Sequence, residues 1–287
     1  MDTIRNPIEW SVDRLQRATR HAGSVGRSLR GAEAGARSQR PVVRRIRTAD
    51  LRDALRKGFA DFGACRTDVV FLCLVYPVVG LVLSRFAFHY DLLPLLFPVA
   101  SGFALLGPVA AVGLYEMSRR REQGGKASWA DAFGAIRSPS FGAIVALGLV
   151  LLAIFLLWLL AAQGLYALTL GPEPPASVGG FVRDVFTTAA GWAMIVAGMA
   201  VGFAFAVLVL SISVVSFPLL LDRDVGLGTA VSTSVRVVAA NPGPLALWGL
   251  VVAGGLAIGS VPLFLGLMIV MPVLGHATWH LYRKTVA

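Results

Sequence analysis

The sequence predicts an all-α, polytopic membrane protein with about six transmembrane helices, on three observations. The chain is 56% hydrophobic and only 15% charged, whereas soluble domains are typically about 25% charged. Several stretches stay apolar over about 20 residues or more, the length that crosses a hydrocarbon core. The Lys and Arg residues lie almost entirely on one side of the membrane that these apolar stretches would cross. These apolar stretches are roughly 69–88, 92–115, 141–170, 187–221 and 245–281.

The last stretch is too long for one span. As a single helix it would extend about 55 Å, against a hydrocarbon core of about 30 Å. The Gly-Ser-Val-Pro sequence at 259–262 supplies a break, because proline lacks an N–H and restricts the residue before it. We therefore expect a helical hairpin here, which brings the count to six. Residues 187–221 are expected to form one tilted helix, with the Ser-Phe-Pro sequence at 216–218 near its exit.

The distribution of positive charge predicts the orientation. The chain has 26 Lys and Arg residues, and all but Arg85 and Arg183 fall on the side of the predicted membrane that holds the N-terminus. Short loops rich in Lys and Arg stay in the cytoplasm. We therefore expect a multi-pass membrane protein with both termini cytoplasmic.

Residues 1–47 are expected to form a basic, disordered cytoplasmic tail, and residues 48–287 the integral membrane domain. The tail is rich in Arg, Ser, Gly and Ala and has no apolar run, so it can neither build a core nor serve as a secretory signal. Anionic lipid attracts each nearby Lys or Arg by about 1 kcal/mol. Because the tail is tethered beside the membrane, lipid headgroups are the expected partner, and no nucleic acid is expected.

Three short segments with apolar residues at helical spacing precede the predicted helix pairs, at 50–62, 128–137 and 226–238, and they are typical of interfacial amphipathic helices. Their apolar residues are Leu51, Leu55, Phe59 and Phe62, then Trp129, Ala132, Phe133 and Ile136, then Leu227, Val231, Val235 and Val238. Asp50, Ser128 and Asp224 are candidate caps. The pattern predicts three repeats of interfacial helix plus helix pair, at about 48–117, 126–221 and 226–287. Loop helices without common ancestry are the alternative.

Several stretches between residues 50 and 287 carry a family resemblance. They are Asp61-Phe-Gly-Ala, Val112-Gly-Leu-Tyr-Glu-Met-Ser-Arg-Arg-Arg-Glu, Ser128-Trp-Ala-Asp-Ala-Phe, Ser216-Phe-Pro-Leu-Leu-Leu-Asp-Arg and Gly275-His-Ala-Thr-Trp-His-Leu-Tyr-Arg. On these the chain resembles an uncharacterised bacterial integral-membrane family, domain of unknown function 2189. The resemblance implies a membrane protein without an assigned function, although some members carry the label cytochrome c oxidase.

The histidines do not favour that label. A haem-copper oxidase subunit holds its cofactors through six histidines, whereas this chain has four, with His21 in the tail and His89 in an outer loop. His276 and His280 share one face of the last helix at i,i+4 spacing, which makes them weak metal candidates. Their place among interfacial residues favours an ordinary polar role. We expect neither a metal nor a cofactor.

No catalytic residues are expected either. The sequence contains no nucleophile elbow, P-loop or dinucleotide fingerprint, and no carboxylate falls well inside a predicted span. The two cysteines, Cys65 and Cys73, are expected at the cytoplasmic end of the first span, where a structural disulfide is disfavoured. These absences argue against an enzyme.

The interpretation that follows is a non-catalytic inner-membrane protein that organises lipids or assists the assembly of membrane complexes, with the bilayer, anionic headgroups and other membrane proteins as partners. A transporter or lipid-handling channel is the alternative, because proline and glycine inside the spans can open backbone carbonyls. A respiratory oxidase-associated subunit is a third possibility. The predicted lipid-facing cations are Arg44, Arg45, Arg47, Arg119, Arg120, Arg121, Arg283 and Lys284.

The predicted topology is tested by labelling single cysteines with a membrane-impermeant reagent. Cysteines near Gln123 and at the C-terminus should react only from the cytoplasm, and one near Pro174 only from outside, because of the charge asymmetry. Labelling of the C-terminus from outside would reduce the number of spans to five.

Overall fold

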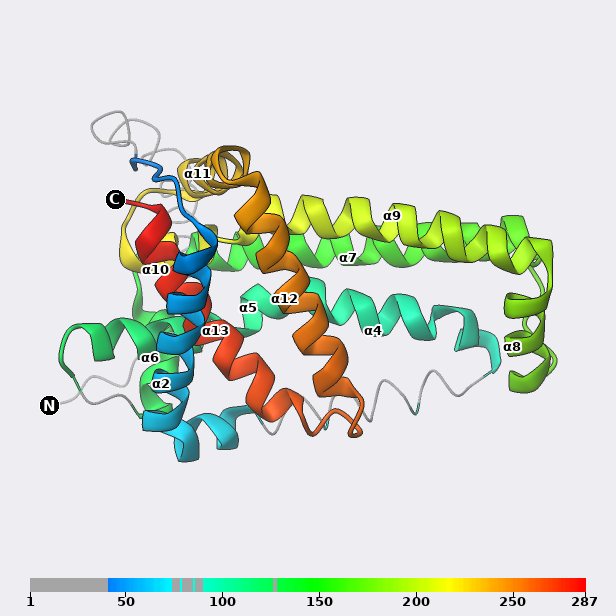
Figure 1. Cartoon of the computed structure of the whole chain (residues 1–287), viewed down its shortest axis with the longest axis horizontal. Coiled ribbons are helices and arrows are strands. Elements are labelled where there is room, and N and C mark those ends of the chain that lie inside the picture. Colours follow the sequence, from blue (N-terminus) through cyan, green and yellow to red (C-terminus); the bar gives the residue numbers. More distant parts are fainter. Residues whose placement is uncertain (1–40, 74–77, 79–84, 86–89, 126–127) are drawn as a thin grey trace, which may run out of the picture.

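The computed structural model of the chain describes residues 41–73, 78, 85, 90–125 and 128–287 (Figure 1). Within these residues the protein is built from helices, joined by turns and one isolated β-bridge between Val43 and Val286. The prediction of an all-α membrane protein is confirmed. Most of the predicted basic tail, residues 1–40, lies outside the described residues.

In chain order the elements are α2 (Thr48–Cys73), the 3-10 helix η1 (Tyr90–Leu95), α4 (Leu96–Leu105), α5 (Gly107–Ala110), α6 (Val112–Glu122), the 3-10 helix η2 (Trp129–Arg137), α7 (Phe141–Thr169), α8 (Val178–Thr187), α9 (Ala189–Ser213), α10 (Ser216–Asp222), α11 (Leu227–Ala240), α12 (Pro242–Ser260) and α13 (Leu267–Thr285).

Three helices in the described part of the chain are long and apolar enough to cross a membrane: α7, the run Ala189–Asp222 that contains α9 and α10, and α12. The first two lie side by side, with α4 alongside them (Figure 1). Trp158 of α7 packs between them, with its ring 5.7 Å from that of Phe205 and in contact range of Gly202. The expected spans 141–170 and 187–221 are thus present, with a turn before Ser216 where the exit was predicted.

Of two other expected spans, one differs and one is not tested. The stretch 92–115 is divided among η1, α4, α5 and α6 rather than forming one helix. Pro94 lies inside η1 and Pro108 is the second residue of α5. A proline lacks an N–H and therefore ends or bends the helix before it. Residues 69–88 fall largely outside the described residues. The count of six spans therefore stays a prediction.

The hairpin expected within 245–281 is confirmed, with α12 ending at Ser260 and α13 beginning at Leu267. Glycines bring the two helices close together, as small residues do in membrane interfaces. A Cβ on Gly266 would lie 2.8 Å from the Cα of Gly259, and one on Gly255 would lie 3.2 Å from Val270.

The three predicted interfacial segments are helical, as α2, η2 and α11. Part of each apolar face is exposed, at Phe59, Ile136 and Val235, which is compatible with helices at a membrane interface. Small or polar residues are buried on the other faces, Ala54 and Asp61 in α2 and Thr233 and Ser234 in α11. The interfacial position of the three helices stays a prediction.

The predicted caps are partly right. Asp131 accepts the backbone N–H of Ser128 at 2.8 Å and closes a capping box at the start of η2. Asp50 accepts the amide of Arg47 at 2.8 Å, so it lies inside the first turn of α2 rather than at the cap. Asp224 does not cap α11, which begins at Leu227; the cap position is held by Gly226, with a φ of +74°.

Residues 41–47 are an ordered extended segment, which corrects the predicted tail boundary. Arg44 donates its amide to the carbonyl of Thr285 at 2.8 Å, and Ala287 donates to Val42 at 2.9 Å. The side chain of Asn241 accepts from the amide of Ile46 at 2.8 Å and holds the segment to α11. These long-range hydrogen bonds were not visible in the sequence, because the segment is basic and contains no strand pattern.

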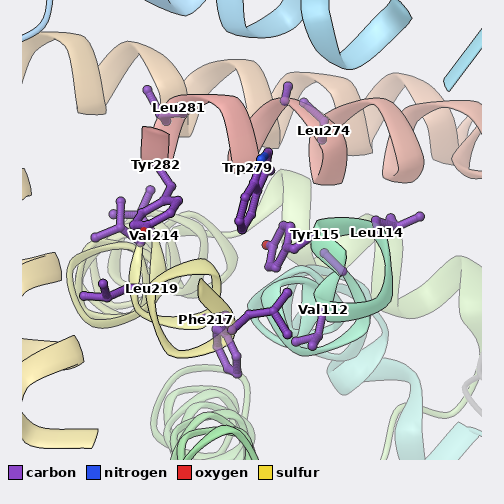
Figure 2. Close-up of a cluster of buried hydrophobic side chains, with 14 of the residues drawn as sticks. Val112, Leu114, Tyr115, Val214, Phe217, Leu219, Leu274, Trp279, Leu281 and Tyr282 are labelled. Carbon is purple, nitrogen blue, oxygen red and sulfur yellow. The ribbon is translucent and has the colours of Figure 1, made fainter. Parts of the chain in front are cut away.

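The core lies where α6, α10 and α13 meet. Figure 2 shows Trp279 and Tyr282 pointing from α13 toward α6 and α10, with Tyr115 and Phe217 on the facing helices. Trp279 and Tyr282 are almost fully buried, and their rings lie 5.4 Å apart. The Trp279 indole donates to Glu122 at 3.0 Å, and the Tyr282 hydroxyl donates to Asp222 at 2.7 Å. Both aromatic residues therefore satisfy their polar atoms at the edge of the core.

Gly58 allows α2 to lie directly on α13, and Gly58→Ala tests that contact. An added Cβ would meet the backbone nitrogen and Cβ of Ala277 at 2.7 Å. Overpacking of this kind costs about 1 to 3 kcal/mol, so the variant should unfold at a lower temperature in detergent. Gly63→Ala is the matched control in the same helix, since nothing lies within 4 Å of its added Cβ. Equal stability of the two variants would contradict the packing.

Candidate functional site

The helices α2, α6, α10 and α13 come together at one end of the molecule (Figure 1), and ion pairs join them there. Lys284 of α13 pairs with Asp50 at 3.2 Å and with Asp53 at 3.0 Å on α2. A hydrogen bond from Lys284 lowers the pKa of Asp53 to about 2. Arg283 pairs with Glu122 at 3.2 Å and Asp222 at 3.4 Å. Ion pairs thus fasten the end of α13 to helices on both sides.

A buried polar cluster lies beneath this surface, formed by Asp61, Ser118, Arg121, His276 and His280. One oxygen of Asp61 accepts from the Ser118 hydroxyl at 2.7 Å and lies 2.9 Å from Nε2 of His280. The other lies 3.1 Å from Nε of Arg121. Burial alone would raise the pKa of Asp61, but hydrogen bonds from His280 and Ser118 outweigh it and hold the pKa below its usual value. Asp61 is therefore a buried, ionised and fully satisfied carboxylate.

His276 completes the cluster. Its Nδ1 lies 2.7 Å from the Ser118 oxygen. Since a serine hydroxyl has one hydrogen, which Ser118 gives to Asp61, Nδ1 of His276 must be the donor in the second contact. Nε2 of His276 is buried and has no hydrogen-bond partner among the described residues.

A second feature is a pocket at the start of α7, here called the basic pocket. It has a volume of about 350 Å³. Its walls come from α6, the end of η2, residues 138–140 and the end of α10. Its lining residues are Glu116, Arg119, Arg120, Gly134, Arg137, Ser138, Pro139, Ser140, Leu220, Leu221, Asp222, Arg223 and Asp224.

Four arginines and three carboxylates line the basic pocket. Glu116 is buried and binds Arg119 and Arg120, each at 2.8 Å. Arg137 is exposed and forms no ion pair within the described part of the chain. Ser140 is 4% exposed, and its hydroxyl has no hydrogen-bond partner among the described residues. Among the described residues, the pocket thus has one arginine without an ion pair, Arg137, and one buried hydroxyl without a hydrogen bond, that of Ser140.

The predicted lipid-facing cations fall into two groups. Arg119, Arg120, Arg121, Arg283 and Lys284 are engaged in ion pairs with carboxylates of the same chain. Arg44, Arg45 and Arg47 are exposed, on the ordered segment beside the C-terminus. Their contact with lipid stays a prediction.

The metal candidates His276 and His280 lie in the polar cluster, where His276 contacts Ser118 and His280 contacts Asp61. Within the described residues no three side chains of His, Cys, Asp or Glu are grouped so that they could hold a metal ion. The spacing on the last helix correctly placed both histidines on one face, and that face turns toward α2 and α6.

The sequence did not single out Asp61, Ser118, Arg137 or Ser140 as site residues. One signal was present for Asp61: it follows Leu51, Ala54 and Gly58 at helical spacing, and all are buried. A carboxylate in that stripe needs a buried cationic partner. Ser140 carried no such signal, because its significance lies in a hydrogen bond that it does not make.

Comparisons with known proteins agree with the membrane assignment. Residues 96–222 match the family described as Predicted integral membrane protein (DUF2189). The match confirms the predicted resemblance to this uncharacterised family over the stretches that begin at Val112, Ser128 and Ser216; those at Asp61 and Gly275 lie outside it. No curated protein and no solved structure matches the chain.

Asp61→Asn should destabilise the protein, because it leaves Arg121 and His280 beside a neutral amide. Loss of one partner of a buried ion pair costs about 3 kcal/mol or more. Asp53→Asn is the control, since its pairs are partly exposed and worth about 1 kcal/mol or less. Thermal unfolding in detergent at neutral pH measures both.

The pH dependence provides a further check on the same variant. The pKa of Asp61 in the folded protein lies below its usual value of 3.8, so its stabilisation is present above that pH and is lost as pH falls below it. The difference between the wild-type protein and Asp61→Asn should therefore shrink in acid. A constant difference would mean that charge is not the cause.

Proposed function

We propose that this protein is a non-catalytic component of the bacterial inner membrane that gathers anionic phospholipid at its cytoplasmic end. One observation supports the proposal most strongly. Arg44, Arg45 and Arg47 are exposed and without ion pairs in the described residues, yet they lie on a segment held rigidly by hydrogen bonds to the C-terminus. Ordered, unneutralised cations beside a lipid-embedded domain favour anionic headgroups as partners.

The energetics are sufficient for enrichment. Each such cation contributes about 1 kcal/mol near an anionic leaflet, so three together favour anionic lipid by roughly 3 kcal/mol, or about a hundredfold. The segment is already ordered, so little conformational entropy is lost when headgroups bind it. Salt should weaken the attraction, because exposed charges are screened.

The order of groups in the polar cluster supports a non-catalytic role. In a Ser-His-Asp triad the histidine lies between serine and carboxylate and takes the serine proton. Here Ser118 lies between His276 and Asp61 and gives its proton to the carboxylate. Ser118 is also fully buried. This geometry favours a cluster that fixes helices over one that activates a nucleophile.

The proposal is tested in nanodiscs of mixed phosphatidylglycerol and phosphatidylcholine, by measuring the lipids retained around the purified protein. The wild-type protein should enrich phosphatidylglycerol, and Arg44→Gln/Arg45→Gln/Arg47→Gln should lose most of that enrichment. Arg183→Gln, on an exposed arginine at the opposite end, is the control and should retain it.

An equal lipid composition around the wild-type protein and the triple variant would contradict the proposal. Enrichment that is indifferent to ionic strength would also contradict it. Either result would leave solute transport as the alternative to pursue.

A further inference from the structure

We propose that the basic pocket at the start of α7 binds the phosphate group of one anionic phospholipid, whose acyl chains then follow the exposed apolar face of α7. This site is distinct from the surface attraction of Arg44, Arg45 and Arg47. It rests on the proposed function only in placing anionic lipid at the cytoplasmic end.

The unpartnered hydroxyl of Ser140 is the first step in the argument. A buried polar group without a hydrogen bond costs about 1 to 3 kcal/mol, and most buried groups in native proteins avoid that cost. Ser140 is 4% exposed and lines the pocket. The backbone N–H of Ser140 donates to the hydroxyl oxygen of Ser138 at 3.2 Å. A phosphate oxygen in the pocket would accept the hydrogen of the Ser140 hydroxyl.

The start of α7 adds a second donor set. α7 runs for 29 residues from Phe141, directly after the pocket-lining residues 138–140. The first amides of a helix have no partner within it, and together with the helix dipole they favour a bound phosphate. The amide of Phe141 is bonded to the carbonyl of Ser138 at 3.0 Å. The side chain of Ser140 makes no capping hydrogen bond, so the amides of Gly142 and Ala143 are the donors left for a ligand.

The charges of the pocket favour an anion. Both oxygens of Glu116 are bound by Arg119 and Arg120, and Asp222 accepts from Tyr282 and lies near Arg283. Arg137 has no such partner in the described residues and is available to a ligand. Asp224 opposes it, because it is exposed at the rim and makes no ion pair there.

The surface of α7 indicates that the phosphate belongs to a lipid. An exposed apolar stripe begins beside Ser140 and continues at helical spacing along the helix. Its residues are Phe141, Val145, Leu149, Leu152, Leu156 and Leu160. A pocket of about 350 Å³ is at the small end of ligand sites, so it fits a headgroup and leaves acyl chains on this stripe.

The test is native mass spectrometry of the full chain in neutral detergent, titrated with phosphatidic acid. Diacylglycerol, which lacks the phosphate, and glycerol 3-phosphate, which lacks the acyl chains, are the comparison probes. One saturable phosphatidic acid site is expected, with at least tenfold weaker binding of either comparison probe. Diacylglycerol loses the charged hydrogen bonds of the phosphate, and glycerol 3-phosphate loses the apolar contact between the acyl chains and α7.

Variants locate the site. Ser140→Ala and Arg137→Gln should each weaken phosphatidic acid binding about tenfold, and Asp224→Asn should strengthen it. Arg45→Gln is the surface control and should not change the affinity for this site. Without lipid, Ser140→Ala should be as stable as the wild-type protein or more stable, since it removes an unsatisfied hydroxyl.

Unchanged affinity in Ser140→Ala and Arg137→Gln would overturn the proposal even if the nanodiscs still enrich phosphatidylglycerol. Equal binding of diacylglycerol would also overturn it, since the phosphate would then be irrelevant. Equal binding of glycerol 3-phosphate would refute the lipid assignment. Conversely, a saturable site without general enrichment would contradict only the proposed function.

Discussion

The carboxylate of Asp61 is the interaction on which the charged end of the molecule depends. It joins α2 to α6 through Ser118 and Arg121, and to α13 through His280. A buried carboxylate without these partners would carry a large desolvation cost. The need to pair the buried Asp61 carboxylate therefore fixes how α2, α6 and α13 align. The close contact between Gly58 and Ala277 and the ion pairs of Lys284 are compatible with that alignment.

Much of the fold followed from the sequence where length and periodicity decide structure. The span 141–170 and the break at 259–262 were predicted correctly, because a bilayer demands about 20 apolar residues and proline interrupts a helix. The stretch 92–115 was expected as one helix, but it is divided among η1, α4, α5 and α6. The helix α8 was not predicted, although its sequence carries a helix start signal. The hydroxyl of Ser177 accepts the backbone N–H of Gly180, and apolar residues follow at helical spacing.

The candidate site was less predictable, for a physical reason. Composition placed the arginines at the correct end, but it could not tell Arg121, which is paired with Asp61, from Arg137, which has no partner in the described residues. That distinction depends on contacts across more than fifty residues of chain. The apolar faces of α2 and α11 illustrate the same limit: periodicity identifies a face, and the surroundings decide whether lipid or protein covers it.

The length of α7 matches the thickness of a bilayer. Its 29 residues extend about 43 Å at 1.5 Å per residue, close to the 40 to 45 Å of a bilayer with both headgroup layers included. α8 lies across the far end of α7 and α9, nearly perpendicular to them (Figure 1). α8 thus lies at one end of α7 and the basic pocket at the other. A thinner bilayer would force α7 to tilt, which would tip the pocket relative to the adjacent headgroup layer.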